Sequence, residues 1–170
     1  MSVQKRRNQL LQKLKKKNKA ITGAELAKEF GVSRQVIVQD IALLRAQGEE
    51  ILATSKGYII PEINNNMVKQ TIACKHNDNE VRKELEIIIK YGGRVKEVIV
   101  EHPIYGELKG LLRIQSKADL EDFMDKYNQN LVKPLSALTK GVHLHTIEAL
   151  NQEVLNLIVN KLKEKGYLLN

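Results

Sequence analysis

Apolar residues recur every three or four positions through the first fifty residues, which is the spacing of amphipathic helices. In residues 4–18, Leu10, Leu11 and Leu14 fall on one face, and basic residues occupy many of the other positions. We therefore predict a first helix with one buried face and a basic outer surface.

Two more helices follow, separated by a glycine turn. The first begins at Thr22, which has capping-box spacing to Glu25, and it ends at Gly31, where a left-handed turn suits glycine. Ser33 can cap the next helix, residues 33–47. The buried stripe of that helix is expected to consist of Ile37, Ile41 and Leu44. Three short helices with this turn predict a helix-turn-helix.

Strand-like residues come directly after the third helix. The segment EEILATSKGYIIP, residues 49–61, predicts two short strands around a Thr-Ser-Lys-Gly turn. A hairpin in this position converts a helix-turn-helix into a winged helix. We therefore expect residues 1–62 to form a winged helix-turn-helix domain.

The positive charge of the chain is concentrated in this domain. The chain has a formal net charge of +8, and residues 1–62 contain 12 Lys and Arg against 6 Asp and Glu. Such an excess is typical of nucleic-acid-binding modules, although a solvated basic surface would have the same composition. Together with the helix pattern, the charge favours double-stranded operator DNA as a partner.

The third helix would read the DNA bases. Gln35 and Gln39 lie nearly opposite its buried stripe, where a glutamine amide can pair with adenine in the major groove. Basic side chains at the wing and at the start of the first helix are candidates for phosphate contacts. The full set of predicted DNA-binding residues is Ser33, Arg34, Gln35, Val38, Gln39, Lys56, Lys5, Arg6 and Arg7.

A different pattern begins after residues 61–67, PEINNNM, which contain proline and three asparagines. We place a domain boundary in this segment. Strand-like and helix-like stretches then alternate in the order β-α-β-β-α-β-α-β, with YLLN as a possible last strand. This order predicts an α+β sandwich over residues 67–170, with helices on one face of a mainly antiparallel sheet.

Histidines in two of these predicted strands suggest a site. His143 and His145 project from the same face of GVHLHTI, His76 ends TIACKH, and Glu84 follows eight residues later in a helix. Three imidazoles and one carboxylate could hold a divalent transition metal, with Cys74 as a further ligand or as a small buried apolar residue. The spacing alone also fits structural or solvent-facing histidines and a solvated glutamate.

Two longer stretches, VIVEHPIYGELKGLLRI and PLSALTKGVHLHTIEA, make the comparison more specific. They resemble the three-histidine (3H) domain of bacterial regulators. GAELAKEFGVSRQVIVQDIALLRAQG resembles the winged helix that precedes the 3H domain in that family, so the resemblance covers nearly the whole chain. It implies a repressor of NAD biosynthesis and niacin uptake genes, with nicotinic acid as co-repressor.

The resemblance also implies roles for individual residues. His76, Glu84, His143 and His145 would bind one divalent transition metal ion per chain, which could be zinc, nickel, iron, cobalt or manganese. His102 matches a histidine of the family motif, and we expect it to form the effector pocket together with Tyr105. Nicotinic acid would dock beside the metal through its ring nitrogen or its carboxylate.

Three functions stay open from the sequence. A ligand-responsive repressor is favoured. A metal-dependent hydrolase or other metalloenzyme with an appended DNA-binding domain is the alternative, although the chain lacks a glycine-rich phosphate loop, an H-E-x-x-H motif and a nucleophile elbow. We therefore expect no enzyme. A purely structural DNA-binding scaffold would leave the histidine pair without a role.

Apolar residues and the single cysteine predict where the protein is located in the cell and whether it forms an oligomer. The single cysteine, Cys74, and the absence of a long apolar run predict a cytoplasmic protein without a membrane span. Apolar positions of the last predicted helix exceed what one small core needs, so we expect a homodimer. These positions are Leu150, Val154, Leu157, Ile158 and Leu162.

Overall fold

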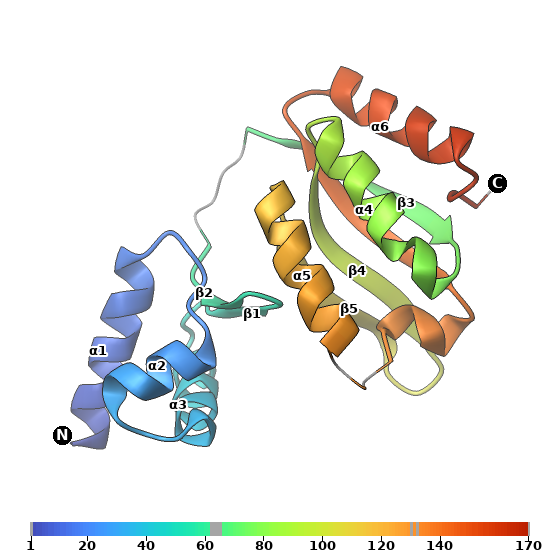
Figure 1. Ribbon diagram of the computed structural model, residues 1–170. Coiled ribbons are helices and arrows are strands. Elements are labelled where there is room, and N and C mark those ends of the chain that lie inside the picture. The colour runs from blue at the N-terminus through green and yellow to red at the C-terminus, as the bar shows by residue number, and fades with distance from the viewer. Residues whose placement is uncertain (1, 62–65, 130, 132, 170) are drawn as a thin grey trace. The chain divides into compact units, whose positions relative to one another are not determined.

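The computed structural model describes residues 2–61, 66–129, 131 and 133–169 (Figure 1). The chain divides into two compact units, Met1–Ile63 and Asn64–Asn170. Each unit has a hydrophobic core of its own. We describe the two units separately.

The first unit contains three helices and a two-stranded hairpin, as the helical spacing predicts. Its elements are α1 (Val3–Lys16), α2 (Gly23–Phe30), α3 (Arg34–Ala46), β1 (Leu52–Thr54) and β2 (Gly57–Ile59). Thr22 and Glu25 form the capping box of α2, and the side chain of Ser33 accepts a hydrogen bond from the backbone N–H of Val36 at the start of α3. Gly31 adopts a left-handed conformation between these two helices.

The core of the first unit joins the apolar faces of all three helices. Its buried members are Leu10, Leu14, Ile21, Leu26, Ala27, Ile37, Ile41, Leu44 and Ile51. The β1–β2 hairpin is held to this core because Ile21 and Tyr58 pair as an isolated bridge. Gly57 is required at this point, since a Cβ there would lie 2.3 Å from the carbonyl oxygen of Ile21.

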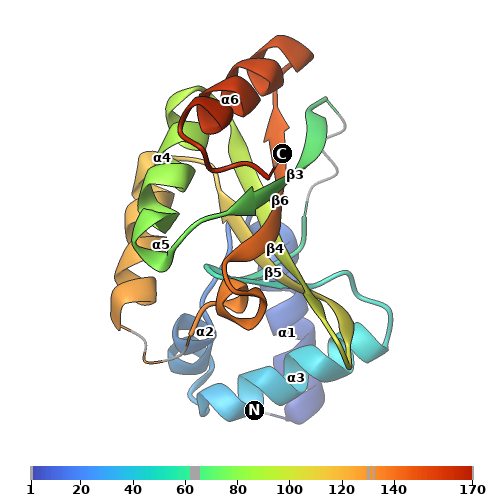
Figure 2. The same cartoon turned by 90° about the vertical axis from the view of Figure 1, so that its right-hand side faces the viewer.

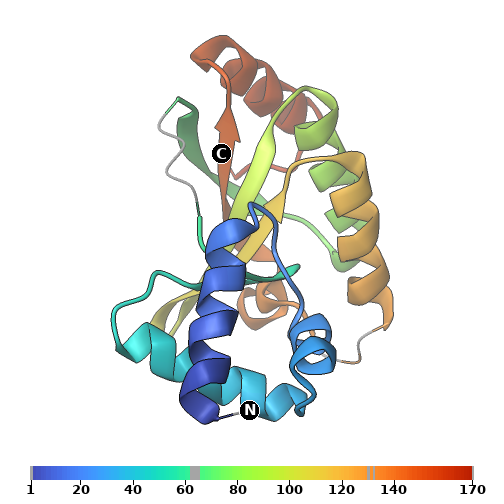
Figure 3. The same ribbon diagram turned by 90° about the vertical axis from the view of Figure 1, so that its left-hand side faces the viewer.

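The second unit is a four-stranded sheet with three α-helices. Its elements are β3 (Val68–Lys75), η1 (Asp78–Glu80), α4 (Val81–Lys90), β4 (Arg94–His102), β5 (Gly106–Ile114), α5 (Lys117–Gln129), η2 (Leu135–Thr139), β6 (Val142–Ala149) and α6 (Gln152–Glu164). The strand order is β3-β6-β4-β5, and all three pairings are antiparallel. Figure 2 and Figure 3 show α4, α5 and α6 on one side of this sheet.

The apolar faces of these helices and of the sheet form one core. Leu85, Ile88, Leu120, Met124, Leu155, Ile158 and Leu162 from the helices pack against Ile72, Val95, Ile114 and Ile147 from the strands. The α+β architecture with an antiparallel sheet is therefore confirmed.

Two local expectations need correction. The segment YLLN is no full strand in the described residues: Leu168 makes an isolated bridge to Cys74 at the edge of β3, and Asn170 lies outside the described residues. Strand β6 continues to Ala149, so α6 begins later, after Asn151, whose side chain accepts a hydrogen bond from the N–H of Val154 at 2.9 Å. The cap at Asn151 sets this boundary.

Candidate metal centre and DNA-binding surface

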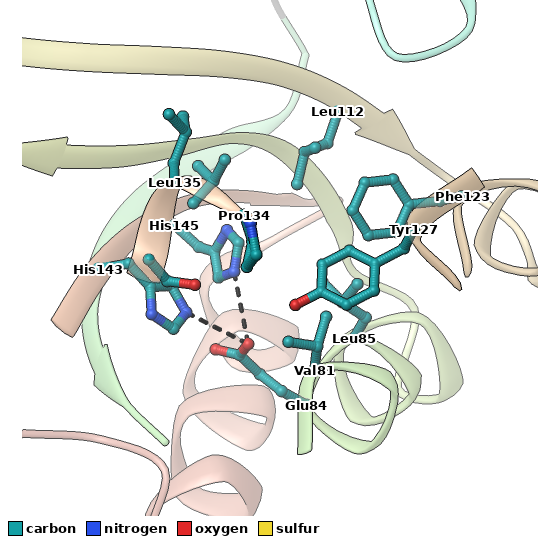
Figure 4. A pocket seen from close by; sticks show the side chains of 12 residues that line it. Val81, Glu84, Leu85, Leu112, Phe123, Tyr127, Pro134, Leu135, His143 and His145 are labelled. Carbon is teal, nitrogen blue, oxygen red and sulfur yellow. Dashed lines mark hydrogen bonds and ion pairs between the residues drawn. The ribbon is translucent and has the colours of Figure 1, made fainter. Parts of the chain in front are cut away.

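Three imidazoles and one carboxylate meet at a single point in the second unit. His76 follows the end of β3, His143 and His145 lie on β6, and Glu84 lies on α4. The Nε2 atoms of His76, His143 and His145 lie 2.6, 3.4 and 3.5 Å, respectively, from Oε2 of Glu84. The four side chains are at most 5% exposed. Figure 4 shows Glu84, His143 and His145 of this group, which we call the histidine cluster.

Each ring of the histidine cluster is anchored through its other nitrogen. The Nδ1 atoms of His76, His143 and His145 lie 2.9–3.0 Å from the backbone carbonyls of Asn77, Gly141 and Glu97. A carbonyl oxygen only accepts hydrogen bonds, so each Nδ1 carries the hydrogen, and a neutral ring then has its lone pair on Nε2. Three lone pairs therefore face one carboxylate oxygen, an arrangement that requires a proton or a cation among them.

The electrostatics of the cluster are consistent with this requirement. Burial alone would raise the pKa of Glu84, but the contacts of its carboxylate with His143, His145 and His76 together hold that pKa well below its ordinary value. Burial alone would lower the pKa of His76, but the hydrogen bond with Glu84, the charge of Glu84 and the contact with Asn77 together outweigh it and raise the pKa. Without a metal, Glu84 is thus ionised, and its charge favours the protonated form of His76.

The second carboxylate oxygen of Glu84, Oε1, is buried and has no hydrogen-bond partner among the described residues. The thiol of Cys74 belongs to the same group, because ligand atoms of Cys74, Glu84 and His143 lie within 4.8 Å of one another and could hold a metal ion. Burial raises the pKa of Cys74, and the nearby Glu84 raises it further, so in the metal-free protein Cys74 is a protonated thiol.

Backbone geometry at Gly141 brings the chain close to the backbone of His76 and anchors the ring of His143. Gly141 has φ of +88°, and a Cβ there would lie 2.5 Å from the carbonyl oxygen of His76. The carbonyl of Gly141 also anchors His143. Sequence reasoning gave this glycine no role, although its place directly before β6 is where such a turn occurs.

A hollow of about 390 Å³, counting its open mouth, adjoins the histidine cluster. Its polar residues are Glu84, Tyr127, Ser136, His143 and His145, four of which are labelled in Figure 4. Its apolar lining consists of Val81, Leu85, Val98, Leu112, Phe123, Pro134 and Leu135. The short helix η2, which the sequence pattern did not predict, contributes Leu135 and Ser136. The hollow thus joins the histidine cluster to a mainly apolar wall.

His102 and Tyr105, the expected pocket residues, are not among the described residues that line this hollow. They lie at the β4–β5 turn, where Nδ1 of His102 accepts hydrogen bonds from the N–H groups of Ile104 and Tyr105. The two rings stack with centroids 5.0 Å apart, and Tyr105 is 72% exposed. His102 therefore closes a turn.

The outer face of α3 carries the predicted base contacts. Arg34, Gln35, Val38 and Gln39 are exposed on it, and Ser33 caps its N-terminus. Lys56 lies in the turn between β1 and β2, and Lys5 is exposed on α1. The structure thus leaves this face of α3 accessible to a partner.

Arg6 and Arg7 occupy a different environment from the one that the sequence suggested. Their Nε atoms donate to Oδ2 and Oδ1 of Asp40 at 2.6 and 2.8 Å, and Asp40 is 1% exposed. Burial alone would raise the pKa of Asp40, but hydrogen bonds from Arg6 and Arg7 hold it below its ordinary value. Both arginines thus tie α1 to α3, a role that spacing along the chain did not reveal.

Comparison with known proteins assigns both units. A 3H domain family model matches residues 69–170, and a helix-turn-helix (HTH) domain model matches residues 6–59. The chain belongs to the 3H-domain family. Its HTH domain is of a kind that binds DNA with the second helix of the motif, here α3.

Two relatives are similar to the 3H-domain chain over nearly its whole length. A "Probable transcription repressor NiaR" of Thermotoga maritima is 41% identical, covering 98% of this chain and 94% of the relative. A "Transcription repressor NadR" of Bacillus subtilis is 40% identical, covering 96% and 93%. Both are named repressors and not enzymes.

No helix in the described parts of the HTH and 3H domains is both long enough and apolar enough to span a bilayer.

Proposed function

We propose that the protein is a transcriptional repressor that binds operator DNA through its HTH domain and senses nicotinic acid through a metal-containing 3H domain. In this proposal it acts in the cytoplasm on genes of NAD biosynthesis and niacin uptake, and nicotinic acid is the co-repressor. The names of two relatives with at least 40% identity support the repressor part. The exposed polar face of α3 supports DNA as the partner.

The convergence of three anchored imidazoles on Glu84 carries the sensing part. Nitrogen from imidazole and oxygen from carboxylate suit zinc, nickel, iron, cobalt or manganese, and the unpartnered Oε1 offers a second oxygen from the same side chain. Carbonyl partners at Nδ1 are the usual outer contacts of metal-binding histidines. The donor set therefore fits one such ion, held by His76, Glu84, His143 and His145.

The hollow beside this cluster would receive the effector. When bound, the metal supplies a positive, Lewis-acidic centre at the polar end of the hollow. The apolar lining from Leu112, Phe123 and Leu135 would enclose a flat ring and exclude water. Effector binding can strengthen DNA binding only if the effector binds the DNA-bound arrangement more tightly than the free one.

A homodimer completes the proposal. DNA sites of helix-turn-helix proteins commonly consist of two half-sites that match a protein dimer. Leu150 and Leu157, near and on α6, are 73% and 43% exposed and offer apolar surface for a partner. Light scattering of the purified chain distinguishes a dimer from a monomer.

The test measures metal content, nicotinate binding and operator binding in the same preparations, with and without a chelator. We expect the wild-type protein to bind nicotinate only when it contains metal, and nicotinate to tighten operator binding. The double variant His143→Ala, His145→Ala should lose the metal and the nicotinate response, because two of the three imidazoles are removed.

The matched control is His102→Ala, which removes the fourth histidine, outside the cluster. This variant should retain both metal and nicotinate binding. Nicotinate binding that survives in the double variant would contradict the sensing part, and unchanged operator affinity with saturating nicotinate would contradict the co-repressor role.

A further inference from the structure

We propose that the hydroxyl of Tyr127 is the donor that recognises the acidic head group of the molecule in the hollow. This inference rests on the proposed function, because it assumes that the hollow is the effector site. It assigns one residue of α5 to ligand selection and places the acid group at the polar end of the site.

Tyr127 has an unusual hydroxyl. The oxygen is buried and has no hydrogen-bond partner among the described residues, whereas nearly all buried hydroxyls in proteins are bonded. The ring packs at 5.9 Å from the ring of Phe123, and Figure 4 shows its hydroxyl end turned toward Glu84 and the two histidines. Burial raises the pKa of Tyr127, so the hydroxyl keeps its hydrogen and can donate it.

The distribution of charge in the hollow fixes where an acid group can lie. Among the described residues that line it, there is no lysine or arginine, and one end is formed by aliphatic and aromatic side chains. A carboxylate buried against Leu112 and Leu135 would have no partner, at a prohibitive desolvation cost. At the other end it would meet the cation proposed for the histidine cluster and the hydroxyl of Tyr127.

The chemical class of ligand follows from these two ends. The site fits a small, flat acid whose carboxylate accepts a hydrogen bond from Tyr127 and whose ring lies against Phe123 and Leu135.

The variant Tyr127→Phe tests the inference because it removes the hydroxyl and little else. Nicotinate and benzoate, which share the carboxylate and differ in the ring nitrogen, serve as probes on metal-loaded protein. We expect both to bind about 10–100-fold more weakly to the variant than to wild type, the usual range for a hydrogen bond to a charged group. Metal affinity should be unchanged.

A second readout separates a ligand contact from a structural role. Removal of a buried hydroxyl without a partner should leave the metal-free protein as stable as wild type or raise its melting temperature. Tyr105→Phe, the same change on the exposed β4–β5 turn, is the matched control and should alter neither binding nor stability.

Each outcome has one meaning. If wild-type, metal-loaded protein binds no nicotinate, the proposed function itself fails. If it binds nicotinate and Tyr127→Phe binds equally well, the role of Tyr127 is refuted. Loss confined to nicotinate would assign the hydroxyl to the ring nitrogen, and a lower melting temperature of the metal-free variant would make Tyr127 structural; both overturn the inference.

Discussion

Two buried carboxylates, one in each domain, are bonded in opposite ways. Asp40 of the HTH domain is 1% exposed, and each of its oxygens accepts a hydrogen bond from an arginine. Glu84 of the 3H domain is fully buried, yet three imidazoles share one of its oxygens and the other has no partner among the described residues. Guanidinium groups stay charged at all ordinary pH values, whereas imidazoles can exchange a proton for a metal. The first arrangement is closed and structural, and the second is open to a cation.

The largest effect is expected from Asp40→Asn. Arg6 and Arg7 would lose a buried counter-ion, and the free energy of unfolding of the HTH domain should fall by about 3 kcal/mol, the lower end of the range for broken buried ion pairs. Denaturant titration measures this loss. Gln39→Ala, on the exposed face of the same helix, should change stability by less than about 0.5 kcal/mol.

The pH dependence of this variant sharpens the same point. The folded-state pKa of Asp40 is lowered, so its stabilising contribution is complete above the ordinary aspartate pKa and is lost as pH falls through the lower folded value. The difference between Asp40→Asn and wild type should therefore be constant at neutral pH and shrink below about pH 4. A difference that does not change with pH would show that the charge of Asp40 is not what stabilises the domain.

Glu84→Gln should have its effect on metal and not chiefly on folding. The variant lacks the negative charge at the centre of the histidine cluster, and its metal affinity should fall by at least about 100-fold, since even loss of an outer partner of a metal ligand costs about 10–100-fold. Competition with a chelator of known affinity measures the change. Asp40→Asn should bind metal like wild type, so equal metal loss in both variants would erase the contrast between the two sites.

Gly141→Ala should weaken the cluster indirectly. A Cβ at Gly141 would push against the carbonyl of His76 and shift the carbonyl that anchors His143, so we expect metal affinity to fall by about 10–100-fold. Gly106→Ala is the matched control: Gly106 also has a positive φ, but nothing lies within 4 Å of its Cβ position. Equal metal affinity in the two variants would contradict the role of Gly141.

The smallest effects concern the outer face of α3. Gln35→Ala and Gln39→Ala should each reduce operator affinity by about 1–2 kcal/mol while affinity for random DNA stays the same, because base contacts discriminate and phosphate contacts do not. Binding assays with operator and random duplexes at one salt concentration give both values. Equal losses on the two duplexes would show that these glutamines do not read bases.

Local patterns were sufficient to predict most elements but not the contacts between distant residues. Caps at Thr22 and Ser33 act within one helical turn, so the sequence places the HTH helices within two residues. Spacing suggested that His76 and His143 could converge, but it also fitted structural histidines, and the family resemblance favoured the metal site. His143 lies on β6 and His76 directly follows β3, which pairs with β6, and no local sequence pattern predicts which strands pair.

The side-chain surroundings that differ from the expected ones have the same cause. Arg6 and Arg7 resemble phosphate contacts in the sequence because their partner, Asp40, lies more than thirty positions away. His102 lies in a motif that suggests a pocket, yet its ring bonds to the next turn. Tyr127 reaches the hollow only because α5 packs beside α4. The residue pattern of one helix does not predict which helix packs beside it.

Strand β6 has neighbours on both sides, β3 and β4, and it carries two of the three imidazoles. Side chains on such a strand lose their freedom when the polypeptide folds, and not when an ion arrives. Binding of an ion would then require little rearrangement of these side chains, so the affinity is not lowered by the entropy lost on ordering them. The protein can therefore bind and release the ion while it stays folded.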